Sequence, residues 1–187
     1  MKKLILISLL ASSMSVQANE EINYSYLEFG YGYLDYANNL APDGFYLDGA
    51  FDLSDHFYIG GYIDSRDSGN SDFNRYDIAF GFHTNGSSKT DFYTEFRAGQ
   101  LEFGNIDGTT TALFSGTRTA FNDRFELITK IGFTNLDGIR QPEGNNIIIY
   151  EAGVKGLFKF SNNQALTAVL ESYDGEFGAR IGYRYSF

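Results

Sequence analysis

The sequence predicts an all-β protein, an up-and-down antiparallel transmembrane β-barrel of ten strands. Three observations support this fold class. Apolar or aromatic residues recur at every second position in ten segments of the chain, which is the period of a strand with one apolar face. Turn residues separate the segments at short intervals. The chain also holds 18 Phe and 14 Tyr but only 2 Pro, which fits strands bordered by aromatic girdles at two membrane interfaces. Eight strands are the alternative, and they would require two of the ten segments to be loops.

Residues 1–18 are expected to be a secretory signal peptide. Lys2 and Lys3 precede an apolar run over residues 4–11, and residues 16–18 form a small-residue cleavage site. The run is too short for a membrane-spanning helix, and no other stretch approaches the roughly 18 apolar residues that such a helix needs. Residues 19–187 are therefore expected to be one exported domain, an outer-membrane β-barrel.

The composition argues against several function classes. The formal net charge is −10, so the chain is a poor partner for nucleic acid, whose phosphates need clustered Lys and Arg. The absence of Cys means that neither disulfides nor thiolate metal sites are available. No cofactor and no metal are expected.

The first five expected strands alternate cleanly between an outward apolar face and an inward polar face. Polar or glycine-rich runs separate them, for example residues 37–43 after the first strand. The outward side chains expected for these strands are Leu27, Phe29, Tyr31 and Tyr33; Phe45, Leu47 and Phe51; Phe57, Ile59 and Ile63; Tyr76, Ile78, Phe80 and Phe82; and Phe92, Thr94, Phe96 and Ala98.

The last five strands follow the same pattern with one weaker segment. Residues 109–120 are the least regular, with Leu113 and Thr117 outward against Gly116 and Arg118. The outward side chains expected for the other four strands are Leu127, Thr129, Ile131 and Phe133; Ile148, Tyr150, Ala152, Val154 and Phe158; Leu166, Ala168 and Leu170; and Phe177, Ala179, Ile181, Tyr183, Tyr185 and Phe187.

The connections are expected to differ between the two ends of the barrel. With a periplasmic N-terminus, the connections at 37–43, 64–72, 102–108, 137–146 and 173–176 face outward, and those at 54–56, 84–90, 121–124 and 160–163 face the periplasm. The outer set is rich in Asp and Glu, including Asp64, Asp67 and Asp72, with only Arg66 and Arg140 against them. We interpret it as a solvated negative rim.

The final segment is expected to close the barrel and to carry its assembly signal. Ile181, Tyr183, Tyr185 and the terminal Phe187 alternate with Gly and Arg, and this ending resembles the signal that the outer-membrane assembly machinery recognises. Arg180 and Arg184 then face inward with Glu28 of the first strand, which the last strand must meet.

Fourteen charged residues share this inner face. An Arg or Lys on the lipid face near the midplane would cost roughly 2–4 kcal/mol, which supports the chosen register. The expected lumen charge network consists of Glu28, Asp48, Asp77, Glu95, Glu126, Glu151 and Glu171 with Arg75, Arg97, Arg118, Lys130, Lys155, Arg180 and Arg184.

This network leaves three functions open. In the first, ion pairs fill the lumen of a non-enzymatic barrel with a structural or surface-interaction role. The alternative is a narrow porin-like channel for ions or small solutes. A hydrolase would need a His, and the only two are His56 in a periplasmic turn and His83 at the periplasmic end of a strand. A solvated turn histidine is commoner than a catalytic one, so no enzymatic activity is expected.

The order of the segments resembles a known group of barrels. The matching stretches are residues 24–28, 43–45, 77–83, 90–92, 116–118, 124–126 and 182–187. They resemble small OmpA/OmpX-like outer-membrane β-barrel proteins, in particular the diffusible-signal-factor-regulated family associated with quorum sensing and virulence. The resemblance implies an integral barrel in the bacterial outer membrane with no established enzymatic activity. The expected partners are outer-membrane lipid, lipopolysaccharide, the assembly machinery and surface ligands, and the barrel is expected to be a monomer.

Overall fold

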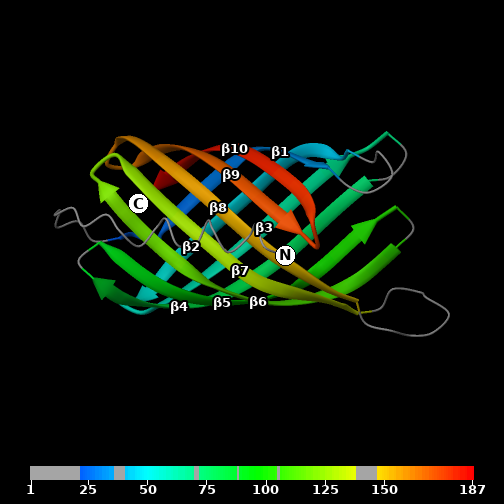
Figure 1. Ribbon diagram of the computed structural model, residues 1–187, viewed down its shortest axis with the longest axis horizontal. Coiled ribbons are helices and arrows are strands. Elements are labelled where there is room, and N and C mark those ends of the chain that lie inside the picture. The colour runs from blue at the N-terminus through cyan, green and yellow to red at the C-terminus, as the bar shows by residue number, and fades with distance from the viewer. Residues whose placement is uncertain (1–21, 36–40, 70–71, 88, 105, 138–146) are drawn as a thin grey trace.

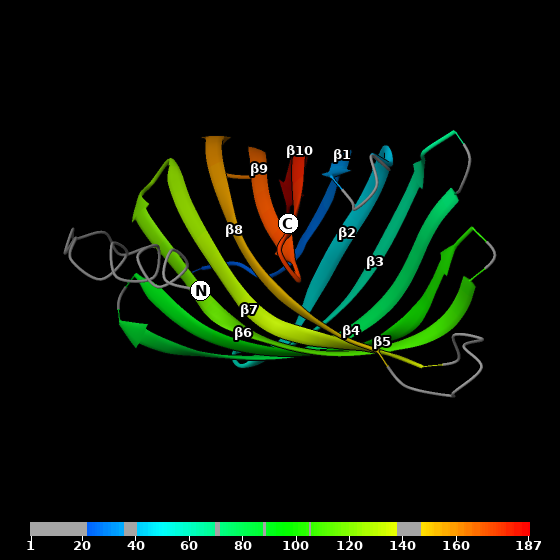
Figure 2. The ribbon, with the colours of Figure 1, turned by 45° about the vertical axis from the view of Figure 1, so that its right-hand side comes forward.

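The protein is a closed barrel of ten antiparallel strands (Figures 1 and 2). The computed structural model describes residues 22–35, 41–69, 72–87, 89–104, 106–137 and 147–187. The strands are β1 Tyr26–Asp35, β2 Asp43–Ser54, β3 Phe57–Asp67, β4 Asp72–Ser87, β5 Thr90–Phe103, β6 Ile106–Asn122, β7 Phe125–Asp137, β8 Ile147–Ser161, β9 Gln164–Tyr173 and β10 Glu176–Ser186.

Each strand pairs with its neighbours in the chain, and β10 returns to pair with β1. The predicted up-and-down topology is therefore confirmed with ten strands and not eight. Closure leaves no unpaired strand edge, which is the condition for strands to span a bilayer. The predicted signal peptide lies outside the described residues. Among the described residues, none belongs to a helix with the length and apolar character needed to cross a bilayer.

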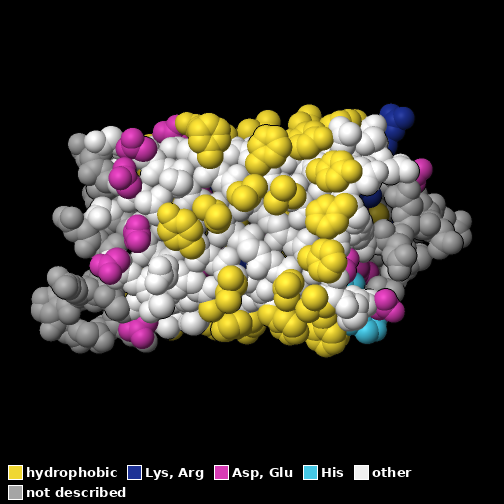
Figure 3. Space-filling view, turned by 180° about the vertical axis from the view of Figure 1, so that it is seen from behind, with side chains coloured by type: hydrophobic (Ala, Val, Ile, Leu, Met, Phe, Trp, Pro, Cys, Tyr) yellow, Lys and Arg dark blue, Asp and Glu magenta, His cyan; other side chains and the backbone are white. Residues whose placement is uncertain are grey.

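The outer face is apolar, as the alternation predicts. Phe45 and Ile78 are each 72% exposed, and aromatic and aliphatic side chains form a belt over the strands in Figure 3. The weakest predicted register also holds, because Leu113 points outward whereas Arg118 is buried inside. Every Lys and Arg within the ten strands lies on the inner face, where it escapes the cost of contact with hydrocarbon.

The two ends of the barrel differ. At one end, which we call the turn end, the strands are joined across 55–56, 88–89, 123–124 and 162–163, and β10 ends there too. The other end, the rim, carries the connections 36–42, 68–71, 104–105, 138–146 and 174–175. Carboxylates gather at the rim, at the left of Figure 3. The expected outer connections at 37–43 and 137–146 fall mostly outside the described residues.

One part of the predicted rim is wrong. Asp64 and Arg66 were expected in the connection 64–72, but they belong to β3 and are 2% and 4% exposed. The reason is that the alternation of β3 continues to Asp67, so even-numbered positions stay inside while Ser65 and Asp67 face out. The two charges therefore belong to the lumen.

Candidate functional site

Ion pairs fill the lumen, and the most enclosed of them joins the first strand to the last. Glu28 on β1 lies directly opposite Arg184 on β10 in the strand register. The Nε and Nη2 atoms of Arg184 both lie 2.8 Å from Glu28 Oε2. Lys155 Nζ lies 3.1 Å from the other oxygen, Oε1, and the Tyr46 hydroxyl donates to Oε1 at 2.9 Å. Glu28 is 0% exposed, so these protein groups, and not bulk solvent, compensate its charge.

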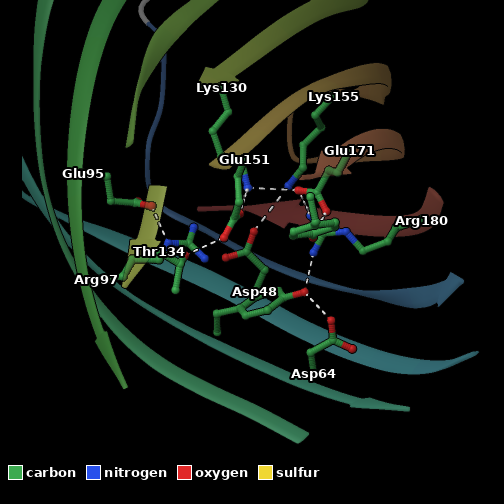
Figure 4. Close-up of polar contacts among 12 residues, drawn as sticks. Asp48, Asp64, Glu95, Arg97, Lys130, Thr134, Glu151, Lys155, Glu171 and Arg180 are labelled. Atoms are coloured by element: carbon green, nitrogen blue, oxygen red, sulfur yellow. Dashed lines mark hydrogen bonds and ion pairs between the residues drawn. The ribbon is translucent and has the colours of Figure 1, made fainter. Parts of the chain in front are cut away.

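A second cluster crosses the middle of the barrel (Figure 4). Lys130 on β7 reaches Glu151 on β8 at 3.3 Å and Glu171 on β9 at 3.1 Å. Arg180 on β10 donates to the same Glu171 at 2.7 Å, and Thr134 donates to Glu151 at 2.5 Å. Four neighbouring strands are thus tied together by shared carboxylates.

The Tyr62 hydroxyl extends this cluster across the lumen to β3. Arg180 Nη1 donates to the Tyr62 hydroxyl at 2.6 Å, and that hydroxyl donates to Asp64 at 2.7 Å. Arg66 completes the chain with a hydrogen bond from Nε to Asp64 at 2.8 Å. A continuous polar path therefore runs from β9 and β10 across the lumen to β3.

Two further pairs lie along β4 and β5. Arg75 contacts Asp77 at 2.7 Å, and Thr110 donates to the same carboxylate at 3.0 Å. Arg97 contacts Glu95 at 2.6 Å. In both pairs the partners are two residues apart on one strand, which places them on the same face.

The remaining expected charges are paired as well. Lys155 Nζ lies 3.3 Å from Asp48. Arg118 Nη2 lies 2.7 Å from Glu126 at the turn end, and Lys159 contacts the same carboxylate at 2.5 Å. All fourteen residues of the expected network thus lie inside the barrel, each within ion-pair distance of an opposite charge.

The sequence reasoning missed several members of the lumen. Asp64, Arg66, Asp91 and Lys159 also lie on the inner face, and parity alone would have placed them there had the strands been extended far enough. The sequence analysis also did not predict the hydrogen bonds of the inward tyrosines, because it considered only charged side chains. These tyrosines are Tyr26, Tyr46, Tyr58, Tyr62, Tyr93 and Tyr173.

The space that remains inside is small. A central cavity of about 100 Å³ extends from Tyr24 near the turn end to Tyr173 near the rim. Cations lie over aromatic rings along its wall, with the Arg97 guanidinium 5.6 Å and the Lys130 ammonium 4.6 Å from the centre of the Phe114 ring. This volume suits a few water molecules.

The two histidines occupy the turn end, as expected, but only His56 is exposed in a turn. His83 is 6% exposed and stacks on Tyr24 with ring centres 4.0 Å apart. Its odd-numbered position in β4, which it shares with Arg75 and Asp77, turns it into the barrel, as the alternation of that segment predicts. Within the described part of the chain, no three His, Cys, Asp or Glu residues come together as metal ligands would.

Comparison with known proteins finds similar folds but no related sequence family. No protein-family model matches the chain, and no curated protein matches it significantly. Among solved structures it is similar to the KdgM porin in complex with disordered oligogalacturonate, with a TM-score of 0.50 and 13% identity over 87% of this chain and 99% of that one. It also matches the NanC porin (TM-score 0.48, 9% identity, 87% and 100% covered) and Ail, the attachment invasion locus protein of Yersinia pestis (TM-score 0.42, 15% identity, 89% and 100% covered).

The match to the KdgM porin supports the class of fold that the closed sheet shows. The chain is a β-barrel of the outer-membrane type, with an apolar outer belt and a charged interior. No family model supports the resemblance to the diffusible-signal-factor-regulated family.

Proposed function

We propose that the protein is a monomeric, non-enzymatic barrel of the bacterial outer membrane with a closed lumen and a structural or surface-interaction role. The observation that supports a closed lumen best is the polar path from Lys130 through Glu171, Arg180 and Tyr62 to Asp64, which crosses the interior from wall to wall. An ion that passed through would have to break contacts between buried charges, and an uncompensated buried charge is strongly destabilising.

Single-channel recording tests this proposal. The purified barrel, reconstituted into a planar bilayer, is expected to give no steady conductance steps. The competing function is a narrow channel, which the extent of the cavity from Tyr24 to Tyr173 favours. Steady steps that change in size with Glu95→Gln or Arg97→Gln would establish the channel and overturn the closed lumen.

The partners proposed for the barrel are membrane lipid, lipopolysaccharide and the outer-membrane assembly machinery, with surface ligands at the rim. Asp43, Asp67 and Asp72 support the contact with lipopolysaccharide, because they lie opposite one another on β2, β3 and β4. Like charges in such positions repel each other, and divalent cations shared with lipid phosphates would relieve the repulsion. The resemblance to signal-regulated barrels supports a virulence-associated role for this surface.

The rim variant Asp67→Asn/Asp72→Asn tests the lipid contact. It is expected to retain less lipopolysaccharide than the unaltered chain when both are purified with Mg²⁺, and the difference should vanish when the cation is chelated. Equal retention in Mg²⁺ would remove the rim from the proposal.

A further inference from the structure

The described residues just before β1 lie inside the barrel. Residues 22–25, which we call the entry segment, lie in the mouth of the barrel at the turn end before β1 begins, and Figure 2 shows this blue stretch inside the wall. Tyr24 and Ser25 are 5% and 8% exposed. Tyr24 packs in a buried cluster with Ala50 on β2 and Tyr58 on β3.

The entry segment touches the wall that faces β1 across the barrel. Arg118 on β6 donates from Nη1 to the backbone carbonyl of Asn23 at 2.6 Å, and its guanidinium lies 5.0 Å from the centre of the Tyr24 ring. Because β6 stands five strands from β1 in a ring of ten, these contacts span the full width of the lumen.

Asp52 on β2 holds the segment on the other side. Its Oδ2 accepts the backbone N–H of Tyr24 at 3.1 Å and lies 3.4 Å from Ser25 Oγ, while Ser25 Oγ accepts the backbone N–H of Asp52 at 3.0 Å. The segment is also fastened to the end of the chain. Asn23 donates to the carbonyl of Phe187 at 3.0 Å, and the Phe187 N–H donates to the carbonyl of Ser25 at 3.2 Å.

The Tyr24 ring lies between groups that leave it little freedom. It stacks on His83 at 4.0 Å and on Tyr58 at 5.1 Å between ring centres. Burial raises the pKa of the Tyr24 hydroxyl well above its ordinary value, so the ring stays uncharged beside these partners. Tyr24 also forms part of the cavity wall, at the end of the cavity nearest the turns.

We propose that the entry segment is a built-in plug that closes the turn end of the lumen and controls access to the central cavity from that side. The plug is specific, because the contacts that hold it come from four separate strands, β2, β3, β4 and β6, and from the last residue. It differs from the central ion pairs, which obstruct the middle of the barrel whether or not the plug is in place. The proposal rests on the closed barrel proposed above and adds which part of the chain closes one mouth.

The first experiment tests whether the plug is docked. The chain has no Cys of its own, so Ser25→Cys/Asp52→Cys introduces a single pair of thiols at positions whose side chains are in contact. Mild oxidation of the folded protein in detergent is expected to form this disulfide nearly completely. The control pair Ser25→Cys/Ser54→Cys, shifted two residues along β2, should form far less. Equal yields for both pairs would mean that the segment has no fixed place in the mouth.

The second experiment tests whether the plug seals. Ala50→Cys places a reporter thiol in the buried cluster beneath Tyr24, and its rate of reaction with a small water-soluble methanethiosulfonate is measured. Adding Tyr24→Ala is expected to speed the reaction at least about tenfold, because the ring contacts that hold the plug are lost. Asp52→Asn, which keeps the size of the side chain, should speed it less.

Tyr173→Ala is the matched control, since it removes a tyrosine from the opposite end of the same cavity. It should leave the reporter rate unchanged, and heat-modifiable gel migration shows that each variant is folded. A fast reaction in Ala50→Cys alone, or equal acceleration by Tyr173→Ala, would overturn the plug. Neither result bears on conductance, which is measured separately, so the plug and the closed barrel can fail independently.

Discussion

At the scale of single residues, Glu28 concentrates more contacts than any other carboxylate described in the lumen. It receives two nitrogens of Arg184, the ammonium of Lys155 and the hydroxyl of Tyr46 while fully withdrawn from solvent. Such a group stabilises the fold only as long as its partners remain, because a buried charge without compensation costs far more than an exposed one. The pair with Arg184 is also the only one of these contacts that joins the first and last strands of the barrel.

Removing Arg184 should therefore cost much of the stability of the barrel. Arg184→Met keeps most of the side-chain length but leaves Glu28 without its main partner, and we expect a loss of about 3–5 kcal/mol. The measurement is urea-induced unfolding in lipid vesicles, supported by the temperature at which the gel migration changes. Tyr183→Phe, next to it on the outer face, should change the stability by less than about 0.5 kcal/mol.

The double variant Glu28→Gln/Arg184→Met provides the internal check. Removing both charges should recover part of the loss, since part of the cost of Arg184→Met comes from a buried carboxylate that has lost its main partner. Arg180→Leu, which removes a partner of Glu171, should also lower stability more than Tyr183→Phe. If the charge variants and Tyr183→Phe were equally stable, the network would have no part in closing the barrel.

At the scale of elements, the junction of β1 and β10 depends on two glycines that face each other. Gly30 pairs with Gly182, and a Cβ atom on Gly182 would lie 2.2 Å from the Tyr46 hydroxyl oxygen and 2.9 Å from the Phe29 carbonyl. The ring of Tyr46 occupies the room that a side chain would need. The absence of side chains here is thus what lets Tyr46 reach Glu28.

Gly182→Ala is expected to impair closure for this reason. The methyl group must displace Tyr46 from its hydrogen bond to Glu28 and press on the β1 backbone, and we expect slower refolding into vesicles and a loss of about 1–3 kcal/mol. Gly61→Ala is the matched control because a Cβ there meets nothing closer than 3.8 Å. A Gly182→Ala variant that folds as fast and as stably as Gly61→Ala would show that the junction tolerates the extra atom.

The strands and their inner faces could be predicted from the sequence, whereas the end of β3 and the position of the entry segment could not. The period of two, interrupted by turn residues, was enough for ten strands, their order and their inner faces, since only one parity keeps Arg118 and its counterparts away from lipid. The prediction ended the third strand too early, at Asp64, because a polar run resembles a loop even where polar residues continue inside a strand whose lumen is polar. The entry segment was missed because Tyr24 and Ser25 look like the start of β1, and their place inside the barrel depends on contacts with β2 and β6.

At the scale of the whole molecule, the two ends imply an orientation. The turn end carries short connections, the C-terminal residue and the entry segment, whereas the rim carries the longer connections and most of the exposed carboxylates. In outer-membrane barrels the short turns face the periplasm and the long loops face outward.

Labelling of intact cells tests this orientation. Asp67→Cys lies at the rim and Asn162→Cys lies in a connection at the turn end, and both side chains are exposed. Because the chain contains no other thiol, a membrane-impermeant maleimide should label Asp67→Cys in intact cells. It should label Asn162→Cys only after the outer membrane is permeabilised, and the unaltered chain provides the background. Labelling of Asn162→Cys alone in intact cells would reverse the orientation and would make the entry segment an outward-facing plug. Labelling of neither site before permeabilisation would contradict a surface-exposed rim.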